Sequence, residues 1–336
     1  MTSPQNPLFA RVIVNRIWEH LFGQGLVTTV DNFGVMGDRP SHPELLDYLA
    51  SRFIQDGWST KRLIRTIVLS HAYQLGSGSS VAYENIDPDD RLVWRHAPRR
   101  LEAEEIRDAI LATSGELQLQ PPGTPLVNSL PMVEIRDNGP ESKKINETAD
   151  RALCRSVYLP LLRGVTPSAL AAFDPVDQTL VSGQRESTTV PTQALFMLNS
   201  AFVGREADAL TRRLLAEKER SDSDKIKLAW QLILNRTPER GEIIRTKKFI
   251  AQYAQAYVQT KPFEPAQPER LVAAVAETDN VADGKAKLAA PINPDDVDTT
   301  EVPVSEEEVR PATPQEAAWL SFIRSLYASA EFRFVR

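Results

Sequence analysis

The sequence predicts a mainly α-helical fold: a single helical domain with one or two short strands and a disordered acidic insertion near its C-terminal end. Apolar residues recur at helical spacing along most of the chain, and residues that start or stop helices flank these segments. The chain has 336 residues, of which 42% are hydrophobic, so it is long enough to bury a sizeable core. We expect a helical body at 1–260, the insertion or linker at 261–312, and a C-terminal helix within 313–336 that packs back on the body.

Start and stop signals define the predicted helices. The first, "PLFARVIVNRIWEHLF", begins at Pro7, which suits the first turn, and glycines follow its end. The second begins at "SHPE", where Ser41 and Glu44 form a capping box, and the last begins at "TPQE", where Thr313 and Glu316 form another. In chain order, the helices are expected at about residues 7–22, 41–57, 60–75, 99–115, 167–173, 191–215, 223–235, 237–258 and 313–332.

Two segments differ from this helical pattern. "RSVYLPLLR", residues 155–163, is the best strand candidate, although Pro160 restricts it to an edge strand or isolated extended chain. Residues 261–312 contain seven of the 24 prolines, with twelve acidic and five basic residues, a composition that favours a disordered linker. Without that insertion the chain has 34 basic and 33 acidic residues, so the net acidic charge belongs to the insertion.

Composition excludes several classes of protein. The net charge of -6 argues against a general nucleic-acid or anionic-membrane binder, because both need a positive field. The single cysteine, Cys154, cannot form an internal disulfide, a Cys-based zinc site or a haem attachment motif, and it is expected to fill the core. No run of about 18 apolar residues occurs, so we predict no signal peptide and no membrane span.

Few residue patterns point to catalysis. The first helix ends in Glu19-His20, but Arg16 stands where a zinc motif needs its first histidine, so we predict no metal site. Phosphate-loop and dinucleotide fingerprints are absent, and we expect no cofactor in this chain. Glu104 and Asp108 share one helix face with Arg107 three residues after Glu104, which suits a general acid and its partner or, as we prefer, an exposed salt-bridged face.

Two loops concentrate polar residues. "DNFGVMGDRPSHPE" carries Asp31, Asn32 and His42 among glycines, the composition of a binding loop or a calcium-type oxygen cluster, without the EF-hand spacing. "SGQRESTTVPTQALFMLNS" places polar side chains just ahead of a helix whose free amide groups suit an anion or a carbonyl. These side chains are Arg185, Thr188, Thr189 and Gln193. Local bracing and a recognition surface remain equally open for both loops.

The first helix carries four polar residues within an apolar sequence. At about 100° per residue, Asn15, Arg16, Glu19 and His20 fall on the side opposite the apolar residues. Arg16 and Glu19 are then neighbours at i and i+3. We predict a structural polar cluster, in which Asn15 and Arg16 hydrogen-bond the backbone of neighbouring loops such as "DNFG".

Several stretches together resemble one family. They are "NPLFARVIVNRIWEHLFGQGLV", "DNFGVMGDRPSHPELLDYLASRFIQDGWSTKRLIRTIVLSHAYQ", "RRLEAEEIRDAIL", "RSVYL", "STTVPTQALFMLNS" and "LNRTPERGEI". They resemble the domain-of-unknown-function family numbered 1553, the C-terminal module of large proteins from planctomycetes and related bacteria. The resemblance covers nearly the whole chain in order, apart from the acidic insertion.

The resemblance implies an organisation more than a mechanism. Members usually carry an upstream companion domain, often a cytochrome-c-like domain that binds haem, and a secretion signal, so this chain resembles the detached end of an extracytoplasmic protein. We expect a non-catalytic docking or interaction module whose partners are upstream domains of the parent protein or another protein. One alternative is part of an enzyme or redox assembly acting on complex polysaccharides, with Glu104, Asp108 or Asp31 lining its cleft. Another is anion or small-ligand binding at Arg185.

Overall fold

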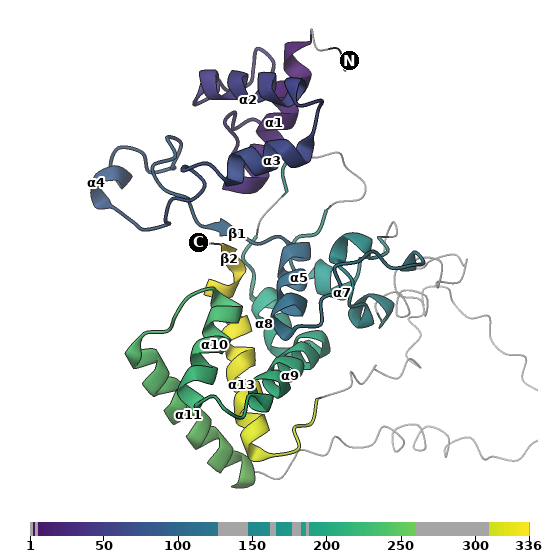
Figure 1. Cartoon of the computed structure of the whole chain (residues 1–336), viewed down its shortest axis with the longest axis vertical. Helices are drawn as coiled ribbons and strands as arrows, with labels where there is room; N and C mark the ends of the chain where they lie inside the picture. The colour runs from purple at the N-terminus through teal and green to yellow at the C-terminus, as the bar shows by residue number, and fades with distance from the viewer. Residues whose placement is uncertain are drawn as a thin grey trace, which may run out of the picture.

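The computed structural model describes residues 3, 6–126, 147–161, 166–176, 183–185, 188–259 and 309–335. It confirms the mainly α-helical fold (Figure 1). The helices are α1 (Pro7–Phe22), α2 (Pro43–Gln55), α3 (Thr60–Val68), α4 (Val81–Glu84), α5 (Ala103–Ser114), α7 (Ser168–Ala171), α8 (Pro191–Asn199), α9 (Ala201–Ala216), α10 (Asp222–Leu234), α11 (Arg240–Gln259) and α13 (Pro314–Ala328). Two 3₁₀ helices, η2 (Ser156–Tyr158) and η3 (Glu331–Arg333), and two strands, β1 (Arg99–Arg100) and β2 (Phe334–Val335), complete the described elements.

These helices bury two separate hydrophobic cores. The small core lies among α1, α2 and α3, and its buried side chains include Val14, Trp18, Leu46, Leu49, Phe53, Leu63 and Ile67. The large core lies among α5, α8, α9, α10 and α13, and its buried side chains include Ile106, Ile110, Met197, Phe202, Leu210, Ala229 and Ile323. Figure 1 shows the α1–α3 group at one end of the molecule, with β1 on the path to the larger group.

The last helix, α13, is central to the large core, as the sequence predicts. Thr313 and Glu316 form the expected capping box, and Pro314 occupies the first turn. The apolar stripe along α13 is buried and includes Trp319, Leu320, Ile323, Leu326 and Tyr327. The helix packs against α8, α9, α10 and α11, so the C-terminal end of the chain closes the large core.

The strands are not where the sequence predicts one. β1 and β2 pair in antiparallel register, Arg99 with Val335 and Arg100 with Phe334. The predicted strand at 155–163 is wrong over residues 155–161, where Ser156–Tyr158 form η2; residues 162 and 163 lie outside the described residues. The physical reason is the contact of this segment with the buried Arg107. The Arg107 guanidinium donates to the carbonyl of Cys154 at 3.1 Å and to the hydroxyl of Ser156 at 3.2 Å, so both residues are held against α5.

Several helix boundaries also differ from the prediction. No hydrogen bond of the described residues forms the expected capping box of Ser41 and Glu44. The N-cap of α2 is His42 instead, and the Ser41 hydroxyl contacts Nδ1 of His42 at 3.0 Å. The predicted helix at 191–215 breaks at Ser200, whose extended backbone separates α8 from α9. Helix α11 begins at Arg240 rather than at Thr237.

The predicted insertion at 261–312 lies largely outside the described residues, which resume at residue 309. Val309 packs against the large core, so the last four residues of that range belong to the folded body. None of the helices in the described part of the chain combines the length and apolar character needed to traverse a bilayer.

Candidate functional site

The four polar residues of α1 divide into two pairs with different surroundings. Asn15 is fully buried rather than on the polar side of the helix. Its amide donates to the Val27 carbonyl at 2.9 Å and accepts from the Val27 amide at 2.8 Å. Gly25 makes room for this contact, because a Cβ there would lie 2.8 Å from Nδ2 of Asn15. Asn15 therefore braces the turn that follows α1, as predicted, although through Val27 rather than through "DNFG".

Arg16 also has a bracing role, but with a side chain rather than a backbone group. It pairs with Asp31 at 3.0 Å and not with Glu19. Asp31 in turn accepts from the Gly183 amide at 2.8 Å. Asp31 is thus held as a link between the loop after α1 and a distant segment, so it is not placed as a catalytic carboxylate.

The other ligand-binding candidates of the first loop have local partners. Asn32 accepts from the Gly34 amide at 3.0 Å, a turn that the side chain makes with its own backbone. The His42 ring contacts the hydroxyl of its neighbour Ser41 at 3.0 Å, the one side-chain bond that His42 makes among the described residues. Within that part of the chain no three histidine, cysteine or acidic side chains gather as metal ligands.

Glu19 and His20, the second pair of α1, line a cavity of about 300 Å³. We call it the α1–α5 cavity. It is formed by four segments that are distant in sequence, at residues 19–24, 97–102, 173–174 and 184–185. Glu102, which directly precedes α5, joins the pair: its carboxylate lies 3.6 Å from Nδ1 of His20 and 3.4 Å from a guanidinium nitrogen of Arg185. The cavity thus joins a carboxylate of α1 with that of the residue that caps α5.

Charge and burial shift the pKa values of these groups in opposite directions. Burial raises the pKa of Glu19 above its ordinary value. The proximity of His20 lowers the pKa of Glu102, and the proximity of Glu102 raises the pKa of His20. Carboxylates with pKa values pushed apart in one cavity are typical of functional sites.

The paired carboxylates of α5 do not act together. Glu104 forms a two-pronged ion pair with Arg185, with N–O distances of 2.6 and 3.0 Å. Asp108 instead accepts from the amide and the hydroxyl of Ser156, both at 2.7 Å. The predicted face is therefore salt-bridged but not exposed: Glu104 pairs with Arg185 and Asp108 with Arg155, and both carboxylates are partly buried.

Arg107 does not pair with Glu104, as its spacing suggests. It is one of the largest fully buried side chains, and burial lowers its pKa. Its guanidinium donates to carbonyls of Ala149 and Ala152 in addition to its bonds with Cys154 and Ser156. Arg107 therefore orders the segment at 149–156, and Asp108 contacts the same segment from outside.

The four polar residues that the sequence predicts as a binding surface at the start of α8 are brought together only in part. Thr188, Thr189 and Gln193 gather around Arg100, which donates to the Thr188 carbonyl, to the Thr189 hydroxyl at 3.2 Å and to Oε1 of Gln193 at 2.6 Å. Asp174 fixes Thr188 from the other side, at 2.8 Å from both its amide and its hydroxyl. Arg185 is absent from this group because Glu104 and Glu102 hold it in the cavity.

A second feature is the loop between α3 and β1, residues 76–98, which we call the projecting loop. Its ends meet where the His96 amide donates to the Gly76 carbonyl at 3.3 Å, and the buried His96 ring stacks on Phe22 of the small core at 5.4 Å. Figure 1 shows this loop, with α4 at its tip, extending away from both groups of helices. Four apolar side chains on it are more than half exposed: Val81 (74%), Tyr83 (56%), Ile86 (75%) and Leu92 (58%).

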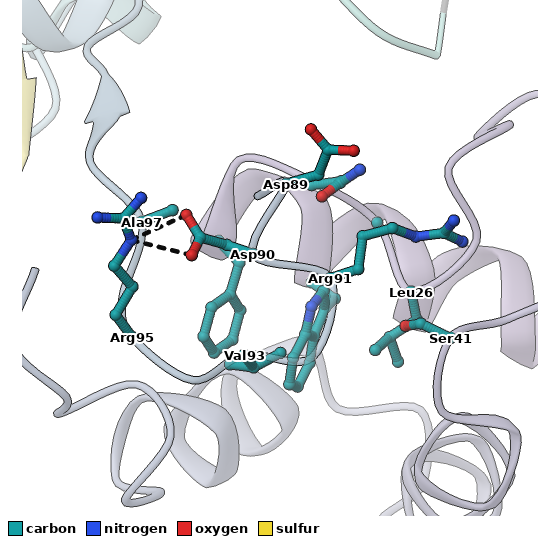
Figure 2. Close-up of a pocket in the computed structure, with 12 residues that line it drawn as sticks. Leu26, Ser41, Asp89, Asp90, Arg91, Val93, Arg95 and Ala97 are labelled. Carbon is teal, nitrogen blue, oxygen red and sulfur yellow. Dashed lines mark hydrogen bonds and ion pairs between the residues drawn. The ribbon is translucent and has the colours of Figure 1, made fainter. Parts of the chain in front are cut away.

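Internal bonds hold the projecting loop in one shape. Asp87 accepts from the backbone amides of Arg91 at 3.0 Å and Leu92 at 2.7 Å. Arg95 makes a two-pronged contact with Asp90, at 2.9 and 3.0 Å (Figure 2). Its guanidinium also lies over the Trp94 ring, at 4.5 Å from the ring centroid. The loop is therefore an ordered element, and its backbone conformation leaves the four apolar side chains exposed.

The backbone of this loop is strained as well. Asp90 and Val93 have φ angles of 54° and 55°, and for β-branched Val93 this left-handed conformation is a genuine outlier. Each such residue costs on the order of 1–3 kcal/mol. The side chain of Val93 packs partly on the small core, which holds the conformation in place, and Figure 2 shows it among the residues that line a small pocket under the loop.

Sequence reasoning missed both Glu102 and the projecting loop. Glu102 stands at the N-cap of α5, where an acidic residue has an ordinary structural explanation. The loop did carry a signal, since Val81, Ile86 and Leu92 are apolar residues in a Gly-, Ser- and Asp-rich stretch without helical spacing. Only the backbone shows that they face away from the cores.

Comparison with known proteins gives one match. Residues 1–250 match a family designated PSD1 and described as "Protein of unknown function (DUF1553)". No curated protein and no solved structure is significantly similar to the chain. Because the family match extends over well more than half of the sequence and agrees with the resemblance carried by its motifs, the chain belongs to the DUF1553 family.

Proposed function

We propose that the chain is a docking module and that the projecting loop is its contact surface. The observation that carries this proposal is an ordered loop that exposes Val81, Tyr83, Ile86 and Leu92. An apolar side chain left in water forgoes the free energy of burial, on the order of 1.5–3 kcal/mol for a large residue. Because internal bonds keep the loop ordered while these side chains stay exposed, contacts outside this chain explain them best.

The charges on the loop indicate the kind of partner. The loop has four acidic residues and two arginines. They are Glu84, Asp87, Asp89, Asp90, Arg91 and Arg95. A complementary partner therefore presents an apolar patch with a basic rim. By its family, the partner we propose is an upstream domain of the parent protein, in an extracytoplasmic assembly that includes a cytochrome-c-like, haem-binding domain.

The polysaccharide alternative has less support. A glycosidase needs two carboxylates on opposite sides of a cleft, whereas Glu104, Asp108 and Asp31 are each engaged by a separate cation or amide. The anion-binding alternative at Arg185 is also weaker, because Glu104 occupies both terminal nitrogens of its guanidinium.

The test is hydrogen–deuterium exchange on the chain with and without the polypeptide encoded upstream in the parent protein. We expect added protection at residues 76–98 and not on the outer face of α11. Ile86→Lys should weaken binding at least about ten-fold, because it places a charge in an apolar contact. Leu119→Lys is the matched control, since Leu119 is 71% exposed but lies outside the loop. Binding that tolerates Ile86→Lys, or protection confined to another surface, would show that the proposal is wrong.

A further inference from the structure

We propose that the α1–α5 cavity binds a small ligand that carries a protonated amine, received by the carboxylates of Glu19 and Glu102. This inference is independent of the docking function, because the projecting loop contributes only its last two residues, Ala97 and Pro98, to the cavity, and none of its exposed apolar side chains lines it. With a volume of about 300 Å³ it is at the small end of ligand-binding pockets. Its basic and acidic groups differ in how fully they are paired.

The guanidiniums around the cavity are occupied. Arg185 uses both terminal nitrogens on Glu104. Arg99 likewise makes a two-pronged contact with Glu105, at 2.9 and 2.8 Å. Arg100 is directed at Thr188, Thr189 and Gln193. An incoming anion would have to displace one of these pairs, so the cavity is poorly suited to an anionic ligand.

The carboxylates have acceptor capacity to spare. Oε2 of Glu19 is shielded from solvent and has no hydrogen-bond partner among the described residues. The nearest cation is His20, whose Nδ1 lies 3.9 Å away, beyond hydrogen-bond distance. The contacts of Glu102 with His20 and Arg185, at 3.6 and 3.4 Å, are also long. A buried carboxylate oxygen without a donor is costly. Because Oε2 is closed to solvent, the Glu19 side chain has to turn toward the cavity, where a ligand N–H would supply the missing donor.

Local charge and shape agree with this ligand class. Five carboxylates, those of Glu19, Glu102, Glu104, Glu105 and Asp174, lie in or beside the cavity, against three guanidiniums, those of Arg99, Arg100 and Arg185. Burial raises the pKa of Glu19 despite the nearby charges of His20 and Arg99, so a ligand cation would offset a cost that these two groups leave in part. Phe22, Leu101 and Phe173 provide apolar wall for the body of the ligand. The site thus suits a primary amine on a short apolar or aromatic group.

A set of three probes of equal size tests the ligand class on the unaltered chain. Benzylamine, benzyl alcohol and benzoate share an aromatic body and differ in the charge of one substituent. By isothermal titration calorimetry we expect benzylamine to bind one site with Kd on the order of 1 mM, the scale for so small a ligand. Benzyl alcohol and benzoate should bind at least about ten-fold more weakly. Benzoate binding as tightly as benzylamine, or no saturable binding of benzylamine, would overturn the proposal.

Two variants then test whether benzylamine binds at Glu19. Glu19→Gln keeps the shape of the side chain and removes its charge, so benzylamine affinity should fall at least about ten-fold. Glu44→Gln, on the exposed first turn of α2, is the matched control and should leave affinity unchanged. Circular dichroism verifies that both variants are folded. Unchanged affinity in folded Glu19→Gln would place the amine elsewhere and contradict the assignment.

Discussion

Replacing Asn15 with alanine tests whether this residue braces the small core. The side chain is fully buried and satisfies both the amide and the carbonyl of Val27, at 2.8 and 2.9 Å. Its removal leaves two buried backbone groups without partners, each worth about 1–3 kcal/mol. We therefore expect the free energy of unfolding to fall by about 2–5 kcal/mol. By contrast, the exposed pair of Arg16 with Asp31 should be worth less than about 1 kcal/mol.

Urea unfolding followed by circular dichroism measures this loss, and hydrogen exchange reports on it locally. The amide of Val27 should lose its protection in Asn15→Ala, because the acceptor Oδ1 is gone. Asn199→Ala, at the exposed end of α8, serves as the control and should change stability by less than about 0.5 kcal/mol. A loss below about 1 kcal/mol with the Val27 amide still protected would refute the bracing role.

Three further predictions concern the large core. In a urea titration, Arg107→Met should lower the free energy of unfolding by about 3–5 kcal/mol, because the buried carbonyls that accept from Arg107 lose their donors. The control Arg155→Met changes a half-exposed side chain and should lower it by less than about 1 kcal/mol. Burial raises the folded-state pKa of Glu206 above its ordinary value of 4.5, so its stabilising contribution is present below that pH and is lost as pH rises through the folded-state pKa. On going from pH 7 to pH 4, the urea midpoint of the unaltered chain should therefore rise more, or fall less, than that of Glu206→Gln. Thr313→Ala removes the cap of α13 and should lower stability by about 1 kcal/mol in calorimetry, and an unchanged unfolding temperature would show that the cap is dispensable.

The helices were predictable because their signals are local. Periodic apolar residues and nearby caps define α1 and α13, and both begin where the sequence places them. The strands were not predictable, since β1 and β2 contain two residues each and pair across more than 200 positions of the chain. Arg107 shows a second limit: its burial depends on carbonyls some 40 residues away, and its own sequence neighbourhood suggests only an exposed charged face.

The candidate site was predictable only in fragments. Glu19 and His20 stood out as polar residues in an apolar helix, but Asn15 and Arg16 had the same appearance and proved to have other partners. What separates the two pairs is the approach of Glu102 and Arg185, which lie more than 80 and 160 residues further along the chain. Spacing within one helix carries no information about such contacts.

The position of α13 at the centre of the large core has a consequence for synthesis of the protein. The contacts of the small core fall within residues 10–96, so the α1–α3 group has everything it needs to fold early on the ribosome. The large core lacks its central helix until residue 328 has been synthesised. β1 cannot pair until β2, at Phe334–Val335, has also been synthesised. A chain that terminates early would therefore combine a folded amino-terminal end with exposed apolar faces on α5, α9 and α10, which is the form that chaperones and proteases are expected to recognise.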